Sequence, residues 1–182
     1  MSALKDKYIK EIAPEMKKDH DLKSVMEVPR LKKIVVNAGI GDFRESREAV
    51  ESFVHDLSML LGQKPYPRKA RLSEAGFKIK QGDIVGYAAT LRGDRMWAFL
   101  EKLINVAIPR IRDFSGLKTD SFDQAGNYSL GIREHIIFPE VNPNTTKGIR
   151  SMQVTIVSSS DDPKLNKALL SKLGMPFKED KE

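Results

Sequence analysis

Segments with strand-like and helix-like periodicity alternate along this chain of 182 residues, and several neighbouring strands are separated by turns too short to hold a helix. Antiparallel strands can be joined by a short turn, whereas parallel strands need a long crossover connection. The pattern therefore predicts an α+β fold with a mainly antiparallel sheet and helices packed on one face. The other face of the sheet, together with the loops, would be free to contact a partner.

Apolar residues at helical spacing predict four helices, at about 4–16, 46–61, 96–108 and 163–173. Ser46 is the expected N-cap of the second helix and Gly62 its end. Strands are expected at 31–38, 84–91 and 150–158, with two shorter ones at 70–72 and 77–79. Residues 63–67 should form an extended linker, 113–131 a long loop, and 178–182 a disordered tail. With no internal repeat or interdomain linker, residues 1–182 are expected to form a single domain.

Positive charge is concentrated in one part of the chain. The whole sequence has 31 basic and 25 acidic residues, a net charge of +6, and the segment from Lys64 to Arg112 alone carries +7. A localised basic region is compatible with a polyanionic partner.

The chain has no cysteine, which excludes disulfides and thiolate metal sites and fits a reducing compartment. The N-terminus is too charged for a signal peptide, and no apolar run is long enough to span a bilayer. A cytoplasmic protein is therefore expected.

An enzymatic function has little support in the sequence. Gly39-Ile40-Gly41 lies between a strand and a helix, as a dinucleotide-binding turn would, but Arg44 occupies the third glycine position of that motif. A plain tight turn is the better interpretation, and a nucleotide-binding α/β enzyme is the alternative. The three histidines show no metal-ligand spacing. Glu134 and Glu140 could form an acid/base pair, but any charged chain offers such pairs. We expect no catalytic residue, no metal, no cofactor and no small-molecule substrate.

The basic segment is interleaved with aromatic residues. Tyr66 and Phe77 lie among basic residues in a stretch rich in glycine and proline, a composition typical of RNA recognition. The alternative is a solvated basic loop with Phe77 buried in the core, and composition alone leaves both open. Arg110 and Arg112 could contact phosphates or cover the end of the preceding helix. Trp97 is expected in the core.

A series of collinear motifs resembles the family of large-subunit ribosomal protein five. These motifs are Ser24–Arg30 with Asn37–Gly41, Gly62–Pro65, Ala75–Ile79, Thr90–Trp97, Pro109–Phe114, Gly126–Gly131 and Ile136–Glu140. Each is short, but together and in this order they are specific. The resemblance implies an N-terminal part at about 24–80 and a C-terminal part at about 84–177 within a single ribosomal protein domain. It also implies a non-enzymatic structural protein of the ribosome, with other large-subunit ribosomal RNA and proteins as neighbours.

The resemblance further implies that the protein binds 5S ribosomal RNA and fixes it in the central protuberance, with a sheet surface facing the RNA. The implied RNA contacts are Asn37, Gln63 and Thr90 as neutral hydrogen-bonding groups, and Lys64, Arg68, Arg92 and Arg95 as cations. A loop around Ser73–Gly82 would face the tRNA in the peptidyl site through Ser73, Gly76, Phe77, Lys78, Lys80 and Gln81. Two regions, Arg110–Gly116 and 133–144, would reach protein thirteen of the small-subunit head, with Arg110, Arg112 and Arg133 as the contacts.

The chain departs from the family pattern in the tRNA-facing loop. Leu72 stands where a basic residue is usual, Glu74 where an apolar one is usual, and Ala88 replaces a residue that is often basic. These changes reduce the positive charge of the loop and of the nearby strand. The 5S RNA interpretation does not depend on them. A generic RNA chaperone is the remaining binding-protein alternative.

Overall fold

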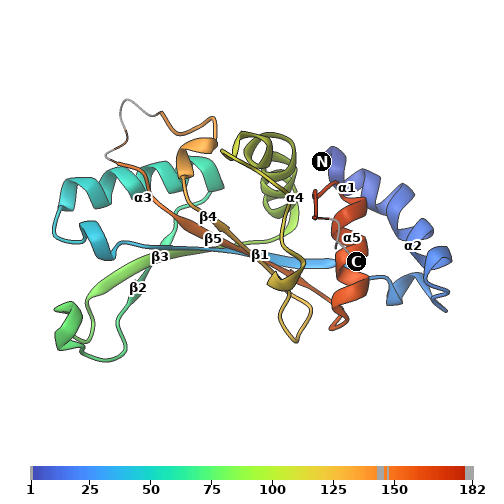
Figure 1. The fold of residues 1–182 in the computed structure, drawn as a ribbon, viewed down its shortest axis with the longest axis horizontal. Coiled ribbons are helices and arrows are strands. Elements are labelled where there is room, and N and C mark those ends of the chain that lie inside the picture. Colours follow the sequence, from blue (N-terminus) through green and yellow to red (C-terminus); the bar gives the residue numbers. More distant parts are fainter. Residues whose placement is uncertain (1, 143–145, 147, 179–182) are drawn as a thin grey trace. The chain divides into compact units, whose positions relative to one another are not determined.

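The computed structural model describes residues 2–142, 146 and 148–178. Five strands form one sheet in the order β2-β3-β1-β5-β4. They are β1 (Leu31–Gly39), β2 (Tyr66–Lys69), β3 (Ile84–Leu91), β4 (Tyr128–Ile132) and β5 (Met152–Ser158). Strand pairing is antiparallel, as between β2 and β3. The predicted α+β fold is thus confirmed (Figure 1).

The helices agree with the apolar periodicity. They are α1 (Ala3–Lys7), α2 (Ala13–Asp19), α3 (Arg47–Leu61), α4 (Gly93–Lys102) and α5 (Pro163–Lys172), with π-helical turns at Tyr8–Ile12 and Leu103–Ala107. The Ser46 hydroxyl accepts a hydrogen bond from the Ala49 amide, and Gly62 ends α3 in the left-handed conformation. Trp97 is buried on α4, as predicted. Short 3-10 turns cover 25–27, 41–43, 75–77, 108–110, 119–121 and 135–137.

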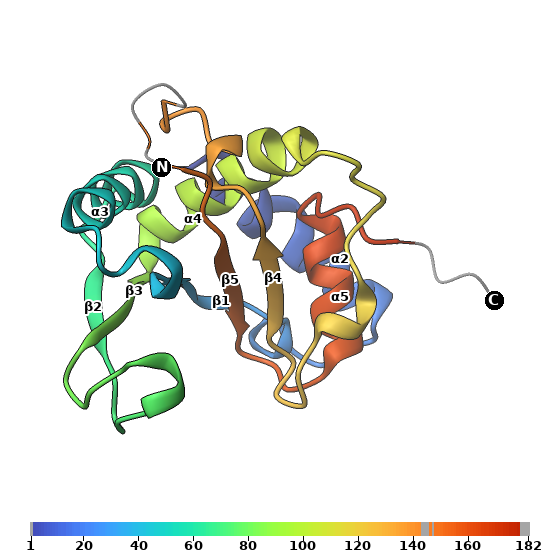
Figure 2. The ribbon, with the colours of Figure 1, turned by 60° about the vertical axis from the view of Figure 1, so that its left-hand side comes forward.

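Contacts divide the chain into two compact units. Unit 1 contains Met1–Ile34, Leu91–Leu130 and Thr155–Glu182, and unit 2 contains Val35–Thr90 and Gly131–Val154. In unit 1, α2 and α5 lie side by side (Figure 2), and Lys172 on α5 forms ion pairs with Glu15 and Asp19 at 3.0 and 2.8 Å. In unit 2, α3 packs an apolar stripe of Phe53, Leu57 and Leu60 into the core.

Two parts of the predicted secondary structure are wrong. The short strands expected at 70–72 and 77–79 are absent, and the strand that pairs with β3 is β2, within and just beyond the expected linker. Pro67 cannot donate a ladder hydrogen bond, but β2 is an edge strand, where proline is tolerated. The expected loop at 113–131 ends in β4. Here glycine and serine alternate with the buried Tyr128, Leu130 and Ile132, which weakens the strand pattern in the sequence.

The remaining predictions about organisation stay open. Residues 143 and 144 of the region expected to reach the small subunit, and residues 179–182 of the expected disordered tail, lie outside the described residues. The single domain remains a prediction. Within the described ranges, no helix is long and apolar enough to cross a membrane.

Candidate nucleic-acid interface

The two faces of the sheet in unit 2 differ in character. On β1, Val36 and Ala38 are buried, whereas Asn37 and Gly39 are exposed. Successive strand residues point to opposite faces, so Asn37 and Gly39 lie on the face away from the core. We call this the open face. Cross-strand partners share a face, and the register places Tyr66 opposite Ala88 and Arg68 opposite Gly86.

The open face combines small residues with neutral polar groups and one cation. On β3, Leu91 and Ala89 are wholly buried, so the alternate residues Thr90, Ala88 and Gly86 point to the open face, where Thr90 is half-buried and Ala88 and Gly86 are themselves buried. Together with β2, β1, β4 and β5, the open face of unit 2 consists of Tyr66, Arg68, Gly86, Ala88, Thr90, Val35, Asn37, Gly39, Gly131 and Gln153. None of these residues is acidic, so the surface can approach a polyanion without charge repulsion.

The three predicted neutral contacts all belong to this unit. Asn37 is exposed at the end of β1, and Thr90 is half-buried near the end of β3. The Gln63 side chain donates a hydrogen bond from Nε2 to the Thr90 carbonyl at 3.3 Å, which holds the residue after α3 against β3. Gln63, in the connection between α3 and β2, thus contacts the backbone of Thr90 on β3, and Asn37 lies on the neighbouring strand β1.

An aromatic residue and a cation form the edge of the open face. The Arg68 guanidinium lies 5.4 Å from the centre of the Tyr66 ring, within the range of a cation–π contact. Tyr66 is 42% exposed and can still offer ring surface to a base. Lys64 is also exposed beside β2. The other two predicted cations, Arg92 and Arg95, belong to unit 1, where they are exposed at the start of α4.

The loop between β2 and β3 is folded by its own hydrogen bonds. Glu74 and Ile79 exchange two backbone hydrogen bonds at 2.8 and 3.0 Å around a 3-10 turn. The Gln81 amide donates to the Ser73 hydroxyl at 2.9 Å. Arg44 donates from Nη2 to the Lys78 carbonyl at 2.9 Å and so ties the loop to the segment after β1. The loop is therefore preorganised rather than a random tether.

This folded loop presents apolar and basic side chains to solvent. Phe77 is 75% exposed and Leu72 is 81% exposed, which decides against burial of Phe77 in the core. The other expected loop contacts are exposed as well: Ser73, Gly76, Lys78, Lys80 and Gln81. The predicted small-subunit contacts are divided between the units, with the exposed Arg110 and Arg112 in unit 1 and the exposed Arg133 in unit 2.

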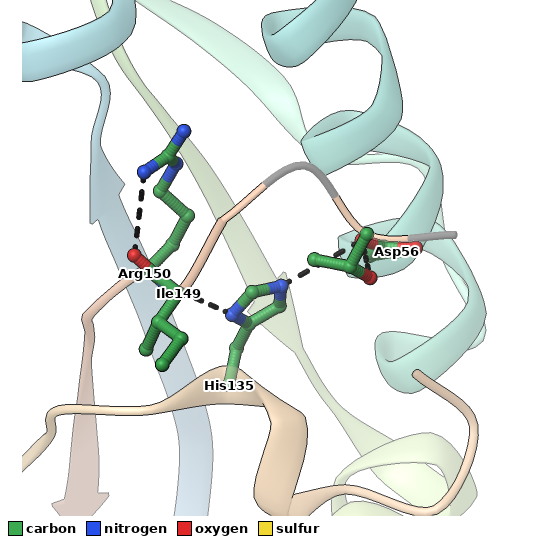
Figure 3. A network of polar contacts seen from close by, with 5 residues as sticks. Asp56, His135, Ile149 and Arg150 are labelled. Atoms are coloured by element: carbon green, nitrogen blue, oxygen red, sulfur yellow. Dashed lines mark hydrogen bonds and ion pairs between the residues drawn. The ribbon is translucent and has the colours of Figure 1, made fainter. Parts of the chain in front are cut away.

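A buried polar cluster in unit 2 was missed from the sequence (Figure 3). His135 has no exposed surface, and its Nδ1 accepts a hydrogen bond from the Arg150 amide at 3.1 Å. Its proton is therefore on Nε2, which faces the Asp56 carboxylate at 3.6 Å. Burial lowers the pKa of His135, and the neighbouring Asp56 opposes this shift only in part. The one signal for this cluster in the sequence was an acidic residue, Asp56, at a position on the apolar stripe of α3.

The buried cluster has a structural role. The Arg150 guanidinium stacks over Phe43 with its carbon 3.8 Å from the ring centre, and the His135 ring meets Phe53 edge-on at 5.4 Å. These contacts join α3 to the segment that leads from β4 to β5. A histidine without solvent contact has no access to a substrate. The described residues contain no group of acids and histidines that could hold a metal ion.

The fold defines an α+β protein with a five-stranded antiparallel sheet, and the open face of unit 2 carries no acidic residue. Comparison with known proteins identifies the family. Residues 24–80 match the family model described as "Ribosomal protein L5", and residues 84–177 match the model of the C-terminus of the same ribosomal protein family. The chain belongs to the ribosomal protein L5 family.

Full-length relatives agree with this assignment. The chain is 49% identical to "Large ribosomal subunit protein uL5" of Herpetosiphon aurantiacus over 179 residues, covering 98% of this chain and 100% of the relative. It is 46% identical to the protein of the same name from Rubrobacter xylanophilus and 48% identical to that from Dictyoglomus turgidum, each over 98% of this chain and 99% of the relative.

Family membership establishes the general function. The chain is a non-enzymatic structural constituent of the large ribosomal subunit, in the cytoplasmic ribosome. It associates there with large-subunit ribosomal RNA and ribosomal proteins. The expectation of an RNA-binding protein without catalytic chemistry is therefore confirmed, and the nucleotide-dependent enzyme is excluded.

Proposed function

We propose that the RNA bound by this chain is 5S ribosomal RNA, and that the open face of unit 2 anchors it in the central protuberance of the large subunit. The observation that carries the proposal is that Asn37 and Thr90 lie on one face of the adjacent strands β1 and β3, with the Gln63 side chain hydrogen-bonded to the Thr90 carbonyl. These residues come from three separate segments of the sequence and all belong to unit 2.

The chemistry of the open face suits a folded RNA. Amide and hydroxyl side chains can donate to and accept from ribose 2′-hydroxyls and base edges, which cations alone do not distinguish. Arg68 and Lys64 supply attraction to phosphates beside these groups, and Arg92 and Arg95 supply it from α4. Hydrogen bonds then carry selectivity, while charge sets the overall affinity.

The loop between β2 and β3 is proposed to contact the tRNA in the peptidyl site. Phe77 offers an exposed ring for stacking, and Lys78 and Lys80 offer cations on either side of Ile79. Because the loop is folded in advance, little conformational entropy is lost on binding. Leu72 and Glu74 reduce its positive charge, so stacking by Phe77 should contribute more than electrostatics.

We propose that exposed arginines make the contact with the small subunit. Arg110 and Arg112 follow the apolar helix of unit 1 and are exposed, and the side chain of Arg112 is 90% accessible. They are proposed to meet protein thirteen of the small-subunit head. Arg133 was predicted for the same contact and is exposed in unit 2.

Binding to 5S ribosomal RNA and to a size-matched control RNA across a salt series tests the main proposal. We expect submicromolar affinity that favours 5S RNA at every salt concentration. Replacing Asn37, Gln63 and Thr90 together with alanine should abolish this preference. Equal binding of the wild-type protein to both RNAs, lost together as salt rises, would reduce the basic segment to a general polyanion patch.

A matched triple variant controls for nonspecific effects. Asn105, Gln124 and Ser171 are neutral polar residues that are exposed in unit 1. Their joint replacement with alanine removes the same kinds of groups outside the open face, and this variant should bind 5S RNA as the wild type does. Circular dichroism must show that both triple variants are folded.

A further inference from the structure

The open face contains a recess that the sequence did not indicate. It has a volume of about 390 Å³ and lies entirely within unit 2. Its lining includes Asn37, Gly39, Gly131, Arg133, Ser151 and Gln153, and the apolar Ile132 and Met152 complete it. The volume lies within the range of about 300–1,000 Å³ that is typical of pockets for small ligands. The recess is therefore large enough for one monomer of a polymeric ligand.

Two of the lining residues are glycines for which the fold gives no reason. A Cβ atom on Gly39 or Gly131 would meet nothing within 4 Å, and neither residue has a positive φ. Glycine weakens a strand because it costs conformational entropy and offers no side chain for packing. Glycine inside a strand often marks a place where a ligand or another backbone approaches closely. Two positions in the lining of the recess therefore lack a side chain, although there is space for one.

The walls of the recess combine one cation with neutral hydrogen-bonding groups. Arg133 supplies the positive charge, and Asn37, Ser151 and Gln153 supply amide and hydroxyl groups. The eight lining residues named above include no acid. One anionic group beside one or more hydroxyls is the ligand that this set matches, and in RNA the phosphate and the ribose 2′-hydroxyl occur together in this way.

We propose that the recess holds one ribose-phosphate unit of the RNA strand that crosses the open face. Arg133 pairs with the phosphate, Asn37, Ser151 and Gln153 bind the ribose hydroxyl, and the bare glycines let the sugar-phosphate backbone approach the strands. This inference rests on the proposed binding of 5S RNA and deepens it. It assigns Arg133 to the RNA rather than to the small subunit.

Filling the recess gives the sharpest test. Gly131→Val adds a β-branched side chain that an exposed strand position accommodates, and it should lower the affinity for 5S RNA at least tenfold. Gly41→Val is the matched control, because a Cβ on Gly41 also meets nothing within 4 Å and Gly41 does not line the recess. The control should bind within twofold of the wild type. Thermal melting checks that both variants are folded.

A second pair of variants separates charge from hydrogen bonding and does not depend on tolerance of valine. Arg133→Ala should weaken binding and make the dependence of log affinity on log salt less steep by about one phosphate contact. Ser151→Ala with Gln153→Ala should weaken binding and leave that slope unchanged. All three side chains are exposed, so these changes should have little effect on stability.

The outcomes distinguish this inference from the function on which it rests. If the wild type prefers 5S RNA but Gly131→Val and Arg133→Ala bind as tightly as Gly41→Val, the recess is not used, and the open-face proposal stands. If the wild type shows no preference for 5S RNA, the proposed function fails and the recess assignment fails with it. Loss of affinity in the recess variants alone supports the assignment.

Discussion

At the scale of single residues, His135 is a wholly buried polar residue of unit 2. Its ring is wholly buried, and its position depends on an amide donor on one side and a carboxylate on the other. Thr146 donates a further hydrogen bond to Asp56 at 2.8 Å. The Thr146 hydroxyl thus satisfies the carboxylate, while the imidazole Nε2 at 3.6 Å lies just beyond hydrogen-bond distance.

The lowered pKa of His135 predicts a pH-dependent stability. In the folded protein, burial lowers the pKa of the imidazole below its ordinary value of 6.5. The imidazole of the unfolded chain takes up a proton near that value. As the pH falls below about 6.5, the unfolded state binds more protons and the free energy of unfolding decreases. The urea midpoint of the wild type should therefore fall between about pH 7 and about pH 5.

Comparison with His135→Gln isolates this contribution. The variant lacks the titrating ring, so its urea midpoint should change less over the same range of pH, even if it is lower throughout. A midpoint that falls equally in both proteins would assign the pH dependence to other groups.

At the scale of elements, Asn166 connects α5 to the turn before β4. Asn166 is 1% exposed, and its Nδ2 donates to the carbonyls of Gly126 and Ser160 at 2.9 and 2.8 Å. Its Oδ1 accepts from the Ser158 hydroxyl at 2.6 Å. Gly126 has a φ of +71°, and a Cβ there would lie 2.3 Å from the Asn166 amide nitrogen, so glycine is required at this contact.

Asn166→Ala should destabilise the protein by about 2–6 kcal/mol, because the buried Gly126 carbonyl and Ser158 hydroxyl lose this partner, at about 1–3 kcal/mol for each such group. Urea unfolding followed by circular dichroism measures the change. Asn105→Ala, at an exposed asparagine, is the control and should cost no more than about 0.5 kcal/mol. Equal effects of the two substitutions would show that the hydrogen bonds of Asn166 contribute little.

At the scale of the whole molecule, the distribution of charge determines how binding responds to salt. Each phosphate contact contributes about 0.7–0.9 to the slope of log affinity against log salt. Replacing Arg92 and Arg95 together with alanine should therefore reduce the slope by about 1.5 and weaken binding to 5S RNA and to control RNA alike. Titration of labelled RNA at several salt concentrations checks this.

The open-face variants should behave in the opposite way. Replacing Asn37 and Thr90 with alanine removes no charge, so the salt slope should stay the same while the preference for 5S RNA declines. An unchanged slope in the double arginine variant would show that α4 does not contact phosphates. The two sets of variants thus separate attraction from recognition.

The sequence alone determined the features that depend on near neighbours in the chain. Apolar spacing placed α3, α4 and α5, and Ser46 and Gly62 marked the ends of α3, because periodicity and capping act within one or two turns. The α+β class followed from the short connections between strands. The family followed from collinear motifs, and the basic segment from counting charges.

Only the tertiary structure decided which residues face one another. Edge pairing with β3 turned an expected linker into β2, and burial of alternate residues made β4 a strand although its pattern is weak. His135 and Asp56 are 79 positions apart, and Asn37 and Gln153 meet at one recess from distant segments. Such proximity depends on strand order and register, which long-range packing sets and local periodicity does not encode.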